Sequence, residues 1–150
     1  MTMRKIPARS IIVQVESATP GTWLTIAGKV SAKINPGENE ETADPADFES
    51  AGNAEEMIMQ RGIKMELEGW LVKDHLTDAQ DPGQARCEDL AAAVAYECYG
   101  AVRFRHPAAT TWKMWPTATF RLGEQGGNTT ELTTWSCTIT RSGASTTAAV

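Results

Sequence analysis

The chain has 150 residues, of which 41% are hydrophobic and 22% are charged, a composition typical of one globular domain. No apolar run approaches the roughly 20 residues needed to span a bilayer, so we expect no membrane insertion by this chain. The formal net charge of −5 argues against a protein that grips nucleic-acid phosphates through basic patches. The apolar run at residues 11–15 is too short for a signal peptide, and the odd count of 3 cysteines fits a reduced, cytosolic chain. We therefore expect a single domain over residues 1–150.

The N-terminal part of the sequence predicts a β-hairpin. From Arg9 to Ser17, alternate residues are apolar, as in a strand with one buried face. A turn at Thr19-Pro20-Gly21 separates this strand from a second one, Thr22 to Gly28.

The segment from Lys29 to Arg61 does not fit a closed domain and predicts a long extended loop. It combines a dense group of carboxylates with a few apolar side chains. The acidic residues are Glu38, Glu40, Glu41, Asp44, Asp47, Glu49, Glu55 and Glu56, and the apolar ones include Phe48, Met57, Ile58 and Met59. A purely solvated linker needs no apolar anchors, so we expect an arm that becomes ordered on a partner. The alternative is a flexible acidic loop with a short amphipathic turn near residues 54–60.

A long half-buried strand is expected from Gly62 to about Asp74, because apolar and charged residues alternate along it. Glu66 and Glu68 lie on the polar face of this strand, together with Lys64.

One helix, about residues 82–99, is predicted after this strand. Asp81 is suited to the N-cap, Pro82 to the first helical position, and Gln84 to a capping-box-like contact. An apolar stripe at helical spacing predicts packing against a sheet. Its members are Cys87, Leu90, Ala91, Val94 and Cys98.

Three further strands are expected at residues 101–106, 110–122 and 132–141. Pro116 lacks a backbone N–H, so the strand around it should bulge or lie at an edge there. The five tryptophans fall on predicted strands and are expected in the core or at subunit contacts, Trp112 and Trp135 above all. The predicted fold is therefore mainly β, an antiparallel β-sandwich or barrel-like domain with one flanking helix and a long loop at about residues 29–61.

The sequence contains no pattern that predicts catalysis. His75 and His106 have no cysteine or histidine at ligand spacing, and the acidic segment lacks the regular oxygen-ligand spacing of a calcium loop. No phosphate-binding glycine loop is present. We predict no catalytic residue, no metal site and no cofactor.

Several short pieces, spread in order through most of the chain, form a pattern together. They are Trp23-Leu24-Thr25-Ile26-Ala27-Gly28, Thr42-Ala43-Asp44 to Gly52, Arg61-Gly62 to Gly69, Asp81-Pro82-Gly83-Gln84-Ala85, Gly126-Gly127-Asn128 and Trp135-Ser136-Cys137-Thr138. In this order they resemble the tail tube (major tail) proteins of long-tailed bacteriophages, especially those of actinobacterial hosts.

This resemblance implies a structural virion protein that is made in the host cytoplasm and closes into homohexameric rings. The rings would stack into a hollow tail tube through the long loop and the termini, in contact with the tape measure protein, and double-stranded DNA would pass through without specific binding. Glu66 and Glu68 are then candidates for positions that face an acidic lumen, although a solvated outer face is equally open to them. The inner tube of a contractile tail, an injection system or a gene-transfer particle is an alternative. A carbohydrate-binding module with exposed tryptophans is a weaker one.

Overall fold

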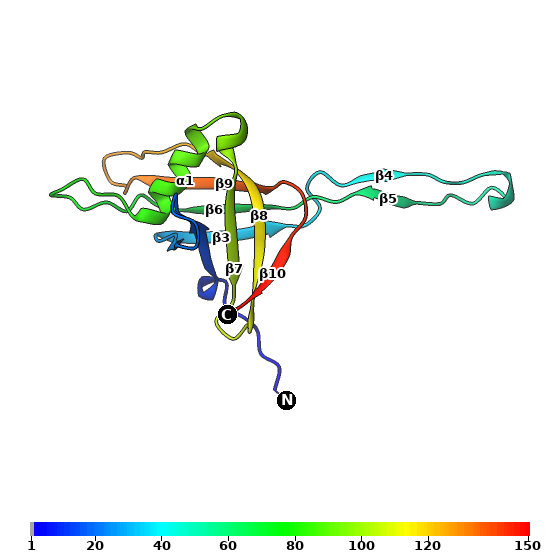
Figure 1. The fold of residues 1–150 in the computed structure, drawn as a ribbon, viewed down its shortest axis with the longest axis horizontal. Helices are drawn as coiled ribbons and strands as arrows, with labels where there is room; N and C mark the ends of the chain where they lie inside the picture. Colours follow the sequence, from blue (N-terminus) through cyan, green and yellow to red (C-terminus); the bar gives the residue numbers. More distant parts are fainter. Residues whose placement is uncertain (1) are drawn as a thin grey trace.

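The computed structural model describes residues 2–150 and shows a body of antiparallel strands from which one long arm projects (Figure 1). The body has eight strands, which all pair in one sheet. They are β1 (Ile12–Glu16), β2 (Trp23–Thr25), β3 (Lys29–Asn35), β6 (Lys64–Trp70), β7 (Gly100–Arg105), β8 (Thr111–Leu122), β9 (Thr134–Arg141) and β10 (Thr146–Ala149). The predicted mainly β, antiparallel architecture with one flanking helix is confirmed.

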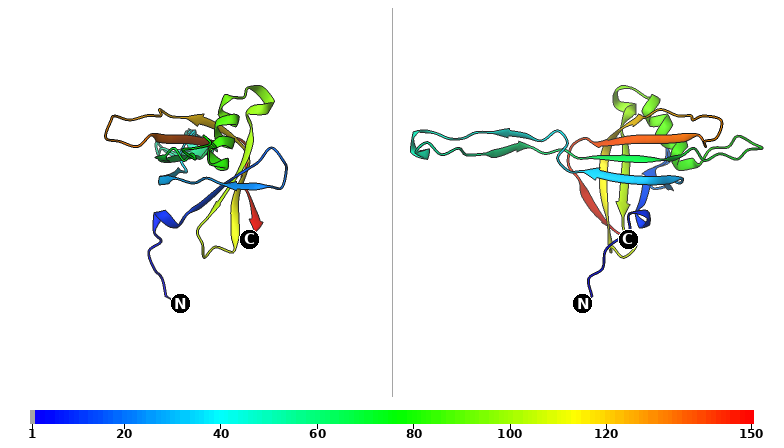
Figure 2. Two further views of the ribbon diagram at one scale, coloured as in Figure 1. Left: turned by 90° about the vertical axis from the view of Figure 1, so that its left-hand side faces the viewer. Right: turned by 180° about the vertical axis from the view of Figure 1, so that it is seen from behind.

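The sheet folds over itself into two layers because strand β8 belongs to both. Its first half pairs with β7 and β10, and its second half pairs with β9. The order of the strands is β2-β1-β7-β8-β9-β6-β3, with β10 beside β8. In Figures 1 and 2 the strands β3, β6 and β9 run across the direction of β7, β8 and β10.

The corner in β8 forms at Pro116. Gly100 pairs with Ala118 but Val102 pairs with Trp115, so β8 has one extra residue opposite β7 at this point. An extra residue bends a strand and increases its twist. The bulge expected from the missing N–H of Pro116 is therefore present, and it allows one strand to serve two layers.

The core lies between the two layers and under the helix. Its fully buried side chains alternate with polar ones along each strand, as predicted from the period of two. The buried cluster consists of Val13, Val15, Ile26, Met65, Leu67, Cys87, Leu90, Val102, Phe104, Trp115, Ala118, Phe120, Trp135, Cys137 and Ile139. Phe104 and Trp115 meet edge to face with ring centroids 5.4 Å apart.

Helix α1 (Pro82–Ala92) begins where expected but ends earlier. The Asp81 carboxylate accepts from the backbone N–H of Gln84 at 3.1 Å, which is the predicted N-cap. The prediction that the helix continues to about residue 99 is wrong. Gly100 lies directly against the Leu90 side chain, whereas residues ten apart in a continuous helix are about 15 Å apart along its axis.

After α1 the chain turns back through a short 3-10 helix, Ala95–Cys98, to enter β7. This return removes the last two members of the predicted apolar stripe from the helix. Val94 is consequently exposed, whereas Cys87 and Leu90 are buried as expected.

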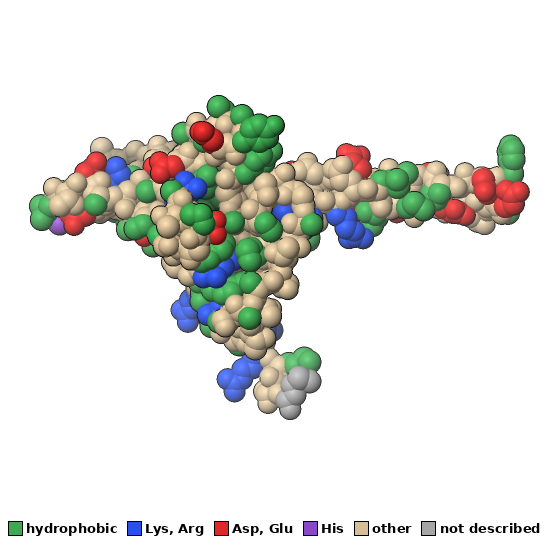
Figure 3. All heavy atoms as spheres, viewed as in Figure 1, with side chains coloured by type: hydrophobic (Ala, Val, Ile, Leu, Met, Phe, Trp, Pro, Cys, Tyr) green, Lys and Arg blue, Asp and Glu red, His purple; other side chains and the backbone are tan. Residues whose placement is uncertain are grey.

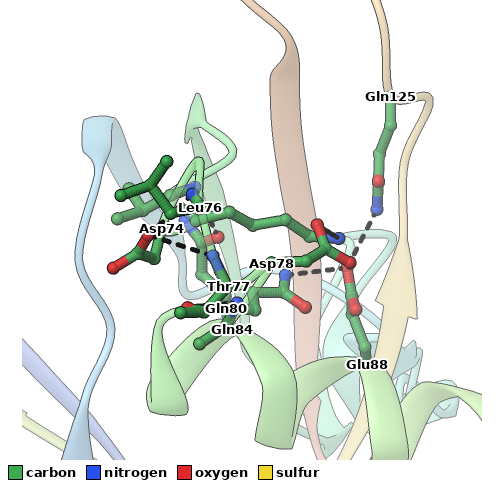
Figure 4. A network of polar contacts seen from close by, with 11 residues as sticks. Asp74, Leu76, Thr77, Asp78, Gln80, Gln84, Glu88 and Gln125 are labelled. Atoms are coloured by element: carbon green, nitrogen blue, oxygen red, sulfur yellow. Dashed lines mark hydrogen bonds and ion pairs between the residues drawn. The ribbon is translucent and has the colours of Figure 1, made fainter.

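Gln84 has a different role from the predicted capping-box contact, since its side chain is completely buried. Its amide accepts from the N–H of Val72 and donates to the carbonyls of Ala27 and Trp70. It therefore joins the start of α1 to the ends of two body strands. One turn later, Glu88 accepts from Gln80 and Gln125, and these side chains form the polar network of Figure 4.

The long segment at residues 29–61 was predicted as a loop throughout, but its first seven residues form strand β3, which pairs with β6. This edge strand has a bulge at Val30 and a short apolar pattern, so its alternation is weak in the sequence. Strand β10, near the C-terminus, was not predicted either. No helix within residues 2–150 is long and apolar enough to cross a membrane.

Candidate functional site

The arm, residues 36–63, is a two-stranded β-hairpin that projects from the body between β3 and β6 (Figure 1). Strand β4 (Glu41–Ala43) pairs with strand β5 (Met57–Gln60) in antiparallel register, with a bulge near Glu41. The predicted amphipathic turn near residues 54–60 is therefore a strand over most of its length. In Figure 2 the arm continues the direction of β3 and β6, so these two strands set its orientation.

The tip of the arm is a defined turn. A short 3-10 helix, Phe48–Ser50, is capped by Asp47, whose carboxylate accepts from the Glu49 N–H at 3.1 Å. The Ser50 hydroxyl closes the capping box and also reaches Glu55 at 2.9 Å. These contacts hold Phe48 at the outermost end of the hairpin.

The base of the arm is attached to the body through charge and close packing. Lys64 forms ion pairs with Glu38 at 3.4 Å and with Glu66 at 3.2 Å. The hydrogen bonds that its ammonium donates to Glu66 and Glu38 raise the pKa of Lys64. A side chain at Gly62 would collide with the Glu38 carbonyl, so only glycine lets the two chain segments at the base of the arm approach this closely.

The side chains predicted to form an inter-subunit arm all lie on this hairpin. With the exception of the half-buried Glu38, each is exposed. They are Glu38, Glu40, Glu41, Asp44, Asp47, Phe48, Glu49, Met57 and Ile58. Phe48 is as exposed as in an extended chain (103%), and Met57, Ile58 and Met59 are at least 41% exposed. A hairpin with this much uncovered apolar surface lacks the packing partner that isolated two-stranded ribbons need in water.

Glu66 and Glu68 lie on the outer face of β6, away from the core, as the alternation predicted. That face is less acidic than their positions suggested. Lys33 of β3 lies opposite Glu66, and Lys64 forms an ion pair with it. The i, i+2 spacing of Lys64 and Glu66 on one strand was the available signal for this compensation. Arg121 adds a third cation, since it pairs with Thr138, the other neighbour of Glu66.

Most of the tryptophans are covered, although Trp70 is 42% exposed. Trp112, Trp115 and Trp135 are buried, as expected for core residues. Arg103 stacks between Trp23 and Trp112, with its guanidinium 4.3 Å and 4.2 Å from the two ring centroids. The ring faces toward this arginine are therefore covered.

Two of the three cysteine thiols are buried and so are not accessible at the surface. Cys87 of α1 and Cys137 of β9 are both buried, and they lie side by side beneath the helix. The hydrogen bond that the Cys87 thiol makes with Cys137, together with burial, raises the pKa of Cys87 well above its usual range. Within residues 2–150 no group of three or more His, Cys, Asp or Glu side chains has the geometry to hold a metal ion.

A fold with these two layers, one helix and a projecting hairpin is found in solved structures. The chain shares its fold with proteins of tail-like particles. One of them is a chain from the tail of an empty gene transfer agent particle, computed with helical refinement and C6 symmetry. Its TM-score is 0.68 at 19% sequence identity, and the match covers 97% of this chain and 100% of that chain.

A chain from the virion of a native gene transfer agent particle has a TM-score of 0.60 at 17% identity, with 97% of this chain and 100% of that chain covered. A chain of the six-fold symmetrised baseplate of the anti-feeding prophage has a TM-score of 0.61 at 10% identity, with 100% and 99% covered. These three structures are parts of tails, virions and baseplates rather than enzymes. No protein-family model and no curated protein sequence matches the chain.

Proposed function

We propose that this chain is a structural subunit of a phage-like tail, which forms hexameric rings that stack into a hollow tube. The observation that carries the proposal is the whole-length similarity to a chain in a tail with helical order and C6 symmetry. Because 97% of this chain is covered, the projecting arm takes part in the similarity. A heterologous contact closes into a ring when its rotation allows, and a second one repeats the ring along an axis.

In this proposal the arm is the inter-subunit element of the domain at residues 1–150. Its uncovered apolar side chains gain a partner only when another copy is present, and the unpaired edge of β3 is available for sheet-to-sheet contact between neighbours. The tube contacts a tape measure protein during assembly in the host cytoplasm, and then resides in the virion. Double-stranded DNA passes through the lumen without specific binding.

The charge of the lumen is a further part of the proposal. A wall that carries phosphate-rich DNA functions best without a strong positive field, because phosphates bind basic surfaces and release counterions. The outer face of β6, with Glu66 and Glu68 beside Lys33 and Lys64, has a mixed charge that meets this requirement. We assign this face to the lumen.

A second candidate function is the inner tube of a contractile injection system. It is favoured by the similarity to a chain of the anti-feeding prophage baseplate. The subunit would have the same task of forming stacked rings, but its outer surface would bind a sheath.

Negative-stain electron microscopy of the concentrated protein tests the proposal, with size-exclusion chromatography and light scattering on the same sample. We expect rings or hollow tubes of uniform width. A variant in which residues 38–61 are replaced by a short turn should keep the β-rich circular dichroism spectrum and lose stacked tubes. A wild-type chain that is strictly monomeric at every concentration would contradict the tube assignment.

A further inference from the structure

The charges of this chain are divided unequally between arm and body. Residues 36–60 contain eight of the 19 carboxylates and none of the 14 lysines and arginines. This part of the arm therefore has a formal charge of −8, and the remainder of the chain has +3. Figure 3 shows red acidic side chains along the arm, whereas the blue basic ones lie on the body, at the base of the arm and on the N-terminal extension. Opposite charges on well-separated surfaces favour contact between copies.

The arm points away from its own body, so its tip lies apart from the other described residues (Figure 1). Phe48 is fully exposed at the outermost turn, flanked by the carboxylates of Asp47 and Glu49. An exposed aromatic side chain between charged residues is the usual composition of an interface anchor with a polar surround.

The body contains a hollow of complementary character, which we call the basic hollow. It has a volume of about 190 Å³ and lies where the ends of β3, β7 and β8 meet. Apolar side chains line it together with basic ones. The lining consists of Ile11, Ile34, Phe104, Arg105, His106, Ala109, Thr111 and Lys113. A neighbouring hollow on the other side of Ile11 adds Arg9 and Lys29.

The positive charges of the basic hollow have no carboxylate to neutralise them. Among residues 2–150 the ion pairs between side chains involve only Lys64 and Lys73 as cations. The Arg105 guanidinium lies on the other face of β7, 4.8 Å from the centroid of the Trp112 ring, and donates to the carbonyls of His106 and Pro107. Next to it, burial and the charge of Arg105 lower the pKa of Arg103. Lys113 shares the face of Phe104, with which it pairs, so it is the cation that an anionic partner in the hollow would meet.

A second hollow, at the opposite end of the same layer, has the wrong charge for the arm. Its volume is about 320 Å³, and Val30, Trp70 and Trp135 line it with the carboxylates of Glu68 and Glu124. Like charges placed together at an interface oppose association, so this acidic hollow would repel the tip. Charge therefore distinguishes between two hollows that both offer apolar surface.

We propose that the tip of the arm docks in the basic hollow of a second copy of this chain. Phe48 enters the apolar lining, while the neighbouring carboxylates of the tip face Lys113. This inference rests on the proposed self-assembly and specifies the surface that receives the arm. Arm and hollow are different surfaces, so the contact is head to tail and repeats from copy to copy.

Disulfide trapping in the full chain tests this contact directly. In a Cys98→Ser background, which leaves only the two buried native thiols, Ala46→Cys at the tip is combined with Ala109→Cys at the basic hollow. We expect mild oxidation to give a ladder of cross-linked oligomers on a non-reducing gel. The matched control combines Ala46→Cys with Thr134→Cys, which lines the acidic hollow and preserves all charges.

Two further variants separate anchoring from charge in the same assay. Adding Phe48→Ala should lower the cross-linked yield by about tenfold, since burial of a phenylalanine is worth at least the ~1.4 kcal/mol that a factor of ten represents. Lys113→Glu should lower the yield similarly, and the loss should be smaller in salt that shortens the screening length from about 10 Å to about 3 Å.

The outcomes distinguish this inference from the proposed function. Tubes seen by electron microscopy, with a ladder at the acidic hollow or at neither hollow, would overturn the docking site and leave the tube assignment intact. A strict monomer without cross-links would contradict both. A ladder restricted to the basic hollow, sensitive to Phe48→Ala, would establish the contact.

Discussion

The buried amide of Gln84 offers the sharpest test of how the helix is attached to the body. Its Oε1 accepts from the Val72 N–H at 3.1 Å, and its Nε2 donates to the carbonyls of Ala27 at 3.0 Å and Trp70 at 2.8 Å. The substitution Gln84→Leu has similar volume but no polar atoms. It would leave one backbone N–H and two carbonyls without these partners.

The magnitude follows from the cost of leaving backbone groups unpaired. Each buried polar group without a partner costs about 1–3 kcal/mol. Trp70 and Val72 are partly exposed, so the lower end of that range applies to each of the three groups. The leucine side chain recovers about 1 kcal/mol through apolar burial. We therefore expect Gln84→Leu to lower the free energy of unfolding by about 2–4 kcal/mol, and the melting temperature by roughly 5–15 °C for a chain of this size.

The assay is urea unfolding of dilute, unassembled protein followed by tryptophan fluorescence. Gln125→Leu is the matched control, because Gln125 donates to Glu88 at 3.2 Å but is exposed, and exposed substitutions usually change stability by less than about 0.5 kcal/mol. If Gln84→Leu costs no more than this control, the amide does not join helix and body as argued.

Three further outcomes follow from the packing. Gly83→Ala should lower the free energy of unfolding by about 2 kcal/mol or more in the same assay, because the added methyl group would lie 2.5 Å from a β2 carbonyl oxygen. This loss is expected even though alanine favours a helix more than glycine does. Gly37→Ala is the control and should be nearly neutral, since no atom lies closer than 3.7 Å to its added methyl group. A thiol reagent at mildly alkaline pH should modify only Cys98 in the folded chain, because Cys87 and Cys137 are buried. The neighbouring Cys137 thiol and burial also raise the pKa of Cys87, which disfavours its reactive thiolate. Modification of all three cysteines before unfolding would show that Cys87 and Cys137 are not buried together. Phe48→Ala should leave the unfolding free energy within about 0.5 kcal/mol of wild type while reducing assembly in light scattering, because the ring touches nothing in its own chain.

Much of the fold could be predicted because its signals are local. Alternation along residues 62–74 placed Met65 and Leu67 inside and Glu66 and Glu68 outside, and the structure has them there. The missing N–H of Pro116 indicated the bulge in β8, and Asp81 with Pro82 marked the start of α1. Each of these inferences depends on a few neighbouring residues.

The candidate site was predicted in part. The density of carboxylates and the apolar residues around Phe48 marked the arm, and the structure places them together on one hairpin. That the arm is a hairpin, with β3 as its root, was missed because short edge strands with bulges have weak patterns. The sequence placed Lys64 on the face of Glu66, but the contribution of Lys33 was missed because it comes from a cross-strand neighbour.

The sequence by itself determined which side of each strand is apolar, where the helix begins and where negative charge accumulates, because backbone periodicity and turn chemistry act over a few residues. Only the tertiary structure decided that β8 pairs with β9 as well as β7, that α1 ends at Ala92, and that Ile11, Phe104 and Lys113 meet in one hollow. Those features depend on contacts between distant segments, whose formation is governed by how the whole chain closes around its core rather than by local pattern.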